Sequence, residues 1–146
     1  MIIAVLNGPN LNLLGTREPE LYGRATLADV EKRLRELSSE LRIDLEFTQH
    51  NGEGELVETV HAMRGRVAGV VVNAGAYSHS SLALRDALVG VGIPFVEVHI
   101  TNTHAREPER RHSMLSSAAV GLVYGLGVQG YELALRGLAA HLTRDG

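Results

Sequence analysis

Polar side chains lie at the end of each of three short apolar runs of the chain, or directly after that end. They are Asn7 and Asn10 after Ile2 to Leu6, Asn73, Ser78 and His79 after Val67 to Val72, and Glu97, His99, Thr101 and Asn102 around the end of Ile93 to Val98. Imidazoles exchange protons near neutral pH, and amides and hydroxyls hold small polar molecules by hydrogen bonds. Together, these groups predict binding or acid–base chemistry on a small polar molecule. Each one alone has a simpler explanation as a turn former or helix cap.

The segment Leu11 to Arg24 is long for a loop between a strand and a helix, and Gly15 and Gly23 stand near its ends. We expect it to be a lid that brings Arg17 and Tyr22 over the strand ends. A guanidinium about 4 Å from a phenolate contributes roughly 4 kcal/mol at an effective dielectric constant near 20. A tyrosinate stabilised in this way could serve as a base. The alternative is that Tyr22 only packs the loop.

Several kinds of chemistry are excluded by the residue types present. The chain has no cysteine, which excludes disulfides, thiolate metal sites and a cysteine nucleophile. Its seven histidines show no metal-binding spacing with a carboxylate, so we expect no metal. Lys32 is the only lysine, and it falls off the apolar stripe of a predicted helix, between Glu31 and Arg33. A lysine imine would have to form on this one solvated side chain.

Three glycines near the end of the chain, Gly125, Gly127 and Gly130, form the pattern of a dinucleotide-binding loop. That loop follows the first strand of its fold, whereas these glycines follow the last predicted strand. We therefore predict a tight turn and close helix packing here rather than a nucleotide site.

A basic cluster contains Arg106, Arg110, Arg111 and His112, interleaved with two glutamates. The chain as a whole has a net charge of -3, so it has no global field that favours nucleic acid or an anionic membrane. We expect the cluster to bind a small anion or to contact another subunit, and we expect no nucleic-acid partner.

Apolar runs alternate with amphipathic stretches along residues 1–146, which predicts a single α/β domain. The expected strands are Ile2 to Leu6, Ile43 to Phe47, Val67 to Val72, Ile93 to Val98 and Ala118 to Tyr124. The expected helices are Leu27 to Leu41 behind a Thr26–Asp29 capping box, Glu55 to Arg64, Ser81 to Val89 and Gly130 to Leu142. Only in the second strand do apolar residues alternate with charged ones, so we place that strand at an edge of the sheet. We predict a three-layer sandwich with a five-stranded parallel sheet of order 2-1-3-4-5.

This fold class places ligands beyond the carboxyl ends of the strands, near the point between strands one and three where the chain reverses its direction of winding. The polar residues named first lie at those ends. The first residues of the chain lack the charge pattern of a secretory signal, and the apolar run is too short to span a membrane. We therefore expect a cytoplasmic protein.

Four blocks of the sequence together resemble one enzyme family, the type II 3-dehydroquinate dehydratases, also called type II dehydroquinases. The blocks are NGPNLNLLGTREPELYG, NAGAYSHSSLALRDAL, EVHITNTHAREPERRHS and GLGVQGYELAL, and the resemblance runs from about Ile2 to Leu142. It implies a flavodoxin-like fold and a homo-dodecamer built from four trimers, with no metal or organic cofactor. It also implies a lyase activity: dehydration of 3-dehydroquinate to 3-dehydroshikimate, the third step of the shikimate pathway to the aromatic amino acids.

The resemblance also implies the catalytic residues of a stepwise elimination through an enolate. Tyr22 matches the general base, and Arg17 matches the lid arginine that activates it. His99 matches the general acid, and Asn10 matches the residue that holds the enolate, through an ordered water.

The remaining site residues come from the same resemblance. Substrate-binding positions are matched by Asn73, His79 and Arg110 for the ring hydroxyls, by the backbone amides of Ile100 and Thr101 for the carboxylate, and by Asp86, which reaches a neighbouring subunit's site. Glu97 matches a position that orients the histidine of the site.

Two alternatives to an enzyme of this family follow from the residues. A flavodoxin-like binding module would hold FMN or another anion at the helix N-termini near Ser80 and Ser81. Such a protein would be yellow when purified with flavin. An assembly protein with an inactive site would form oligomers without turning over substrate.

Overall fold

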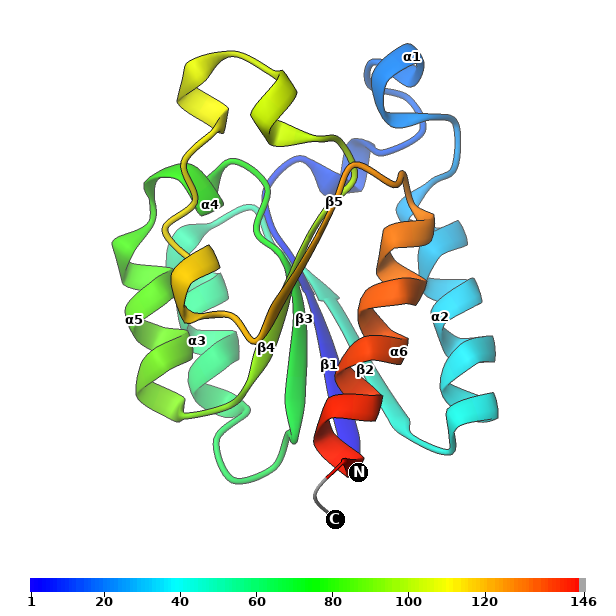
Figure 1. The fold of residues 1–146 in the computed structure, drawn as a ribbon, viewed down its shortest axis with the longest axis vertical. Helices are drawn as coiled ribbons and strands as arrows, with labels where there is room; N and C mark the ends of the chain where they lie inside the picture. Colours follow the sequence, from blue (N-terminus) through cyan, green and yellow to red (C-terminus); the bar gives the residue numbers. More distant parts are fainter. Residues whose placement is uncertain (145–146) are drawn as a thin grey trace.

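The computed structural model of the chain describes residues 1–144 and contains one five-stranded parallel sheet (Figure 1). Its strands are β1 (Ile2–Asn7), β2 (Asp44–Gln49), β3 (Gly69–Asn73), β4 (Phe95–His99) and β5 (Gly121–Tyr124). Their spatial order is β2-β1-β3-β4-β5, which confirms the predicted topology, with β2 at one edge. The burial pattern explains the edge position, because β1, β3 and β4 are almost wholly buried whereas β2 is only partly so.

Helices cover both faces of the sheet (Figure 1). On one face lie α2 (Leu27–Leu41) and α6 (Gln129–Thr143), and on the other lie α3 (Glu53–Ala62) and α5 (Leu82–Val91). Two separate apolar cores result, because successive side chains of a strand point to opposite faces of the sheet. Ile3 and Val5 pack toward α2 and α6, whereas Ala4 and Leu6 pack toward α3 and α5.

Local signals in the sequence explain where some elements begin. Thr26 and Asp29 form the predicted capping box, in which each side chain accepts a hydrogen bond from the other residue's amide. The Ser81 hydroxyl caps α5 by accepting a hydrogen bond from the Leu84 amide at 2.9 Å.

No helix among residues 1–144 is long and apolar enough to cross a membrane.

The last predicted strand is too long at its start. Residues Ser116–Ala118 form a 3₁₀ turn, and β5 begins only at Gly121. The turn forms because the Ser113 hydroxyl accepts hydrogen bonds from the amides of Leu115 and Ser116. The apolar composition of this stretch therefore gives way to a local side-chain cap.

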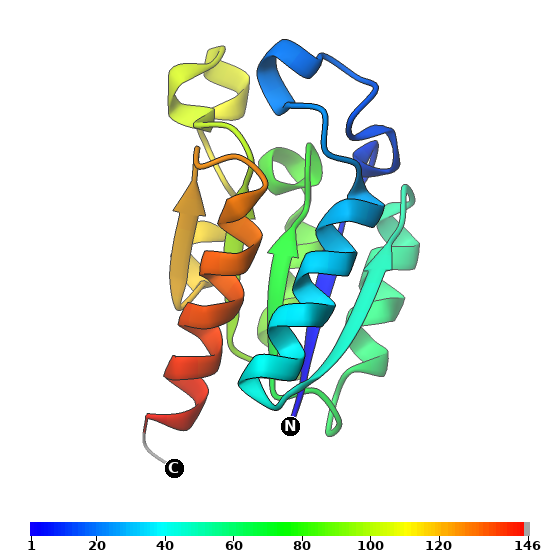
Figure 2. The same ribbon diagram turned by 90° about the vertical axis from the view of Figure 1, so that its right-hand side faces the viewer.

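Short helical turns that the sequence did not predict lie above the sheet. They are α1 (Pro19–Tyr22), α4 (Tyr77–Ser80) and 3₁₀ turns at Leu11–Leu13, Thr103–Ala105 and Pro108–Arg110. In Figure 2, α1 and the yellow segment that contains the last two turns lie side by side beyond the carboxyl ends of the strands. These two segments form the roof of the site described below.

Glycines bring the ends of neighbouring strands close together. The Gly8 amide donates a hydrogen bond to the Asn73 carbonyl at 2.8 Å, and a Cβ atom at Gly8 would lie only 2.3 Å from the Ala74 carbonyl oxygen. Only glycine fits there, so the chain after β1 and the chain after β3 run in contact.

The three-glycine pattern is a turn, as predicted. Gly125 and Gly127 have positive φ angles of 87° and 68°, and their amides donate to the carbonyls of His99 and Ile100. At Gly130 a Cβ would lie 3.3 Å from Val98 Cγ2, so the glycine lets α6 pack closely on the sheet. The turn thereby fixes the backbone at the end of β4.

Candidate active site

A cavity of about 160 Å³ opens at the carboxyl ends of β1, β3 and β4, under the two roof segments. Nine of the predicted site residues line it: Asn10, Arg17, Tyr22, Asn73, His79, His99, Ile100, Thr101 and Arg110. Arg106 and Thr103 line it as well, although the sequence did not predict them as site residues. Residues from five separate segments of the chain therefore meet around one small space.

The lid contributes Tyr22 as the last residue of α1. Its hydroxyl accepts a hydrogen bond of 2.7 Å from Nη1 of Arg106. Two guanidinium carbons lie over the Tyr22 ring, that of Arg17 at 5.4 Å from the ring centre and that of Arg106 at 5.5 Å. The phenol is thus flanked by two cations, and only Arg106 contacts its oxygen.

A hydrogen bond from a charged donor such as Arg106 is stronger than one from a neutral donor, so Arg106 holds the Tyr22 hydroxyl in place. Arg17 was expected to activate the phenol, and it lies against the ring rather than on the hydroxyl. Arg106 was assigned only to a basic cluster, because a separation of 84 residues in the sequence gives no sign of its contact with Tyr22.

His99 ends β4 and is only 5% exposed. Its Nε2 lies 2.6 Å from Oε2 of Glu97, which is fully buried on the same strand. The other ring nitrogen, Nδ1, makes no hydrogen bond within residues 1–144, and His99 lines the cavity. Nδ1 is therefore the atom that can exchange a proton with a ligand.

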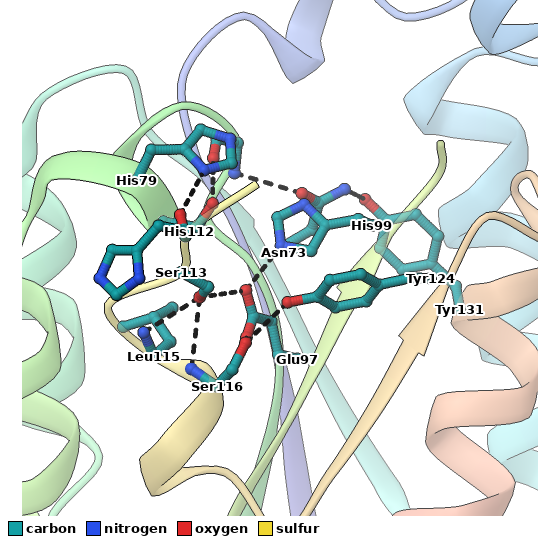
Figure 3. Close-up of polar contacts among 12 residues, drawn as sticks. Asn73, His79, Glu97, His99, His112, Ser113, Leu115, Ser116, Tyr124 and Tyr131 are labelled. Carbon is teal, nitrogen blue, oxygen red and sulfur yellow. Dashed lines mark hydrogen bonds and ion pairs between the residues drawn. The ribbon is translucent and has the colours of Figure 1, made fainter. Parts of the chain in front are cut away.

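The Glu97 carboxylate is held by hydroxyl groups as well as by His99 (Figure 3). Ser113 donates to Oε2 at 2.7 Å, and Ser116 donates to Oε1 at 2.6 Å. Burial alone would raise the pKa of Glu97, but the hydrogen bonds from His99, Ser116 and Ser113 outweigh it and hold the pKa below its ordinary value. Glu97 is thus a buried carboxylate that stays ionised and is hydrogen-bonded to His99, the contact that the resemblance implied for it.

Two asparagines face the cavity from the ends of β1 and β3. Asn10 has a left-handed backbone with φ of 69°, and its amide donates to Oδ1 of Asn51 at 3.0 Å. Asparagine adopts this conformation more readily than most residues. This leaves the side-chain amide of Asn10 beside the cavity.

Asn73 is held from behind by Tyr131 of α6, which is fully buried (Figure 3). The Asn73 side-chain amide donates to the Tyr131 hydroxyl at 2.8 Å, and that hydroxyl donates to Oδ1 of Asn7 at 2.7 Å. Burial raises the pKa of Tyr131 well above its ordinary value, so the hydroxyl remains a donor. The sequence had not indicated Tyr131, whose apolar helical neighbours are typical of a core position.

Other cavity groups are positioned by the roof segment. Nδ1 of His79 lies 2.9 Å from the His112 carbonyl, and burial lowers the pKa of His79. Arg110 is ion-paired with Glu107. The amides of Ile100 and Thr101 donate no hydrogen bond to any group within residues 1–144, and both residues line the cavity.

Some residues singled out in the sequence lie elsewhere. Asp86 is exposed on α5 and lines a separate surface depression with His61 and Arg64. Lys32 is exposed on α2 and does not line the cavity. Ser81 is buried and already caps α5, which leaves its hydroxyl engaged within the chain.

No group of three or more potential metal ligands of the His, Cys, Asp or Glu type occurs within residues 1–144. The cavity brings together a phenol flanked by two guanidinium groups, a buried imidazole paired with a carboxylate, and several hydrogen-bond donors. This set can abstract a proton from one part of a small molecule and return one to another part.

The chain resembles proteins of one kind in sequence and in structure. Residues 1–139 match the family described as dehydroquinase class II. A 3-dehydroquinate dehydratase of Gemmatimonas aurantiaca is 61% identical over 142 residues, which cover 97% of this chain and 93% of that protein. A catabolic 3-dehydroquinase 1 of Aspergillus terreus is 55% identical over 95% of this chain and 91% of that protein.

Solved structures agree with the sequence comparisons. The crystal structure of a type II dehydroquinase from Propionibacterium acnes superimposes with a TM-score of 0.90 at 46% identity, over 95% of this chain and 96% of that one. A second type II dehydroquinase, from Butyrivibrio crossotus, gives a TM-score of 0.92 at 38% identity, over 94% and 97% of the two chains.

Proposed function

Because the chain belongs to the class II dehydroquinase family, we propose that it dehydrates 3-dehydroquinate to 3-dehydroshikimate, the third step of the shikimate pathway. The observation that carries the proposal is the pairing of Tyr22 and His99 around one cavity, each with its own activating partner. Neither a binding module nor an assembly protein needs a phenol on a guanidinium and a buried imidazole on a carboxylate.

The reaction begins with proton removal. The Tyr22 phenolate takes a proton from the carbon next to the ketone, and the electron pair moves onto the ketone oxygen to form an enolate. Arg106 and Arg17 stabilise the phenolate before this step. Asn10 stabilises the enolate, through an ordered water, because preorganised donors lower the energy of a developing oxyanion.

The second step expels water. The enolate electrons return to form the carbon–carbon double bond, the bond from the ring to the hydroxyl breaks, and the departing oxygen takes a proton from Nδ1 of His99. His99 is then left as the neutral tautomer that keeps its proton on Nε2, which is the nitrogen bound to Glu97. Transfer of the proton from Tyr22 back to His99, by way of solvent, restores the starting state.

The rest of the cavity binds the substrate. The free amides of Ile100 and Thr101 are suited to the carboxylate, and Asn73, His79 and Arg110 are suited to the ring hydroxyls. We assign Asp86 to the site of a neighbouring subunit in a homo-dodecamer of four trimers. Its position on an exposed face of α5, outside its own chain's cavity, is consistent with that role.

The proposal includes a reaction without metal or organic cofactor and without an imine, in the cytoplasm. Lys32 would have to form any imine, and it lies outside the cavity. Borohydride added together with substrate should therefore leave the activity intact. Inactivation would revive a lysine route.

The direct test is incubation of the purified protein with 3-dehydroquinate while the ultraviolet absorbance of the conjugated enone product is followed, with and without a chelator. We expect absorbance to rise equally in both samples. A folded protein that forms no enone would overturn the proposal, and a yellow protein that binds FMN would favour a flavin-binding module instead.

A further inference from the structure

A hydroxyl cluster is hydrogen-bonded to the Glu97 carboxylate of the Glu97–His99 pair (Figure 3). It consists of Ser113, Ser116 and Tyr124, and none of the three lines the cavity. Ser113 and Ser116 donate to the two oxygens of the Glu97 carboxylate. The hydroxyl of Tyr124 lies 2.7 Å from Oγ of Ser116.

Counting protons gives the direction of these hydrogen bonds. Ser116 has one hydroxyl proton, and the ionised Glu97 Oε1 can only accept it. Tyr124 must therefore donate its own proton to Ser116 Oγ. The result is a one-way chain from the Tyr124 hydroxyl through Ser116 to Glu97, in which every proton points toward the carboxylate.

Tyr124 also contacts the imidazole directly. Its ring packs edge to face with the His99 ring, at 4.6 Å between centres and an angle of 76°. Two further imidazoles surround the pair: His79 stacks at 6.2 Å from His99, and His104 stacks at 5.8 Å from Tyr124 on its outer side. One residue thus supports the acid in two ways, through the ring and through the chain of hydroxyls.

We propose that Tyr124 is a positioning residue for His99: its ring fixes the plane of the imidazole, and its hydroxyl, through Ser116, keeps the Glu97 carboxylate ionised and aligned with Nε2. A buried carboxylate with too few donors becomes protonated, and a protonated Glu97 no longer accepts the Nε2–H of His99. The Nδ1 proton would then be badly aimed at the departing hydroxyl. This inference rests on the proposed dehydration, in which His99 is the acid.

The Tyr124 hydroxyl is well suited to remain a donor. Burial raises the pKa of Tyr124 to about 12, so the phenol keeps its proton throughout the neutral range. This sets it apart from Tyr22, whose hydroxyl accepts a hydrogen bond from a guanidinium. The structure thus uses one tyrosine as a proton donor behind the acid and another as the base in front of the substrate.

The test compares Tyr124→Phe, which keeps the ring, with Ser116→Ala, Ser116→Thr and the control Ser38→Ala. Ser38 is buried on α2, and its hydroxyl donates to the Arg35 carbonyl outside the cluster. Each protein is assayed for kcat and KM with 3-dehydroquinate, and the Glu97 side-chain carboxyl is titrated by ¹³C NMR in the absence of substrate.

Tyr124→Phe removes one neutral hydrogen bond, so we expect it to lower kcat about 2- to 10-fold with KM unchanged. Ser116→Ala removes a hydrogen bond to the ionised Glu97, so we expect it to lower kcat about 10- to 100-fold with KM unchanged. Both should move the Glu97 titration to higher pH. Ser116→Thr, which keeps a hydroxyl, should retain the wild-type kcat and titration, and Ser38→Ala should change neither.

Other outcomes overturn the inference. If the wild type turns over 3-dehydroquinate but Tyr124→Phe and Ser116→Ala match it in kcat and in the Glu97 titration, the positioning role is wrong and the proposed function stands. If they lose kcat with no change in the titration, or if KM rises in proportion, the cluster supports the fold or the binding site rather than the acid. If the wild type forms no enone, the inference fails together with the proposed function.

Discussion

The hydroxyl of Tyr22 and Nη1 of Arg106 lie 2.7 Å apart, which joins the lid to the opposite roof segment directly above the cavity. The Arg106 side chain is partly buried there, and the one carboxylate that pairs with it among residues 1–144, that of Glu107, lies 4.0 Å away and is half exposed. The positive charge of Arg106 is therefore directed mainly at the phenol. This contact fixes the Tyr22 hydroxyl beside the cavity.

Arg106→Ala should reduce activity more than Arg17→Ala. A hydrogen bond to a charged group contributes about 1.5–3 kcal/mol, so we expect kcat at neutral pH to fall about 10- to 100-fold without Arg106. Arg24→Ala, which removes an exposed arginine next to the lid, serves as the control. A kcat of Arg106→Ala equal to that of the wild type would contradict this role.

Tyr22→Phe should abolish most of the turnover while the fold persists. Removal of a general base typically costs about 10²- to 10⁴-fold in rate, and no other side chain that lines the cavity presents a phenol. Steady-state assays over a range of pH would measure the loss. Circular dichroism would establish that the variant is folded. Turnover within a few-fold of the wild type would reject Tyr22 as the base.

Gly8→Ala should damage stability and activity together. The new Cβ would lie 2.3 Å from a backbone oxygen of Ala74, so the ends of β1 and β3 must move apart, and overpacking of this kind costs about 1–3 kcal/mol. Asn10, which follows β1, and Asn73, which ends β3, would shift with them. Gly54→Ala is the matched control, because Gly54 is exposed on α3 and no atom lies within 4 Å of the new Cβ. Urea unfolding should show the control to be more stable than the wild type by about 0.5–1 kcal/mol. A fully active, stable Gly8→Ala protein would contradict the close-approach argument.

Much of the fold could be predicted because its signals are local. Continuous apolar runs indicated the inner strands, the alternation at Ile43 to Phe47 indicated the edge strand, and Thr26 with Asp29 marked the start of α2. Polar residues after the runs indicated the correct edge of the sheet. These features follow from burial periodicity and capping, which each segment carries in its own residues.

The partners of the site residues could not be predicted in the same way. Arg106 contacts Tyr22 across 84 positions, and Tyr131 contacts Asn73 across 58. Nothing in either segment identifies the other, because these contacts are set by how the roof and α6 pack on the sheet. The late start of β5 has a similar cause, since the Ser113 and Ser116 hydroxyls are drawn to the buried Glu97 carboxylate.

Tyr131→Phe should destabilise the protein at neutral pH. The substitution removes the hydroxyl that accepts from Asn73 and donates to Asn7, so two buried amide groups lose a partner. Such a loss costs about 1–3 kcal/mol. Because the same hydroxyl holds the side chain of Asn73 in place, we also expect KM for 3-dehydroquinate to rise.

The deficit of Tyr131→Phe should shrink in alkali. Burial raises the pKa of Tyr131 above its ordinary value of 10.0, so the unfolded chain releases this proton near pH 10 while the folded chain still holds it. The folded wild type therefore loses stability as pH rises above 10, and a phenylalanine at this position does not contribute to that loss. Urea unfolding of both proteins at pH 7 and pH 11 measures the difference. A deficit of the same size at the two pH values would show that the Tyr131 hydroxyl is not held in its protonated form by burial.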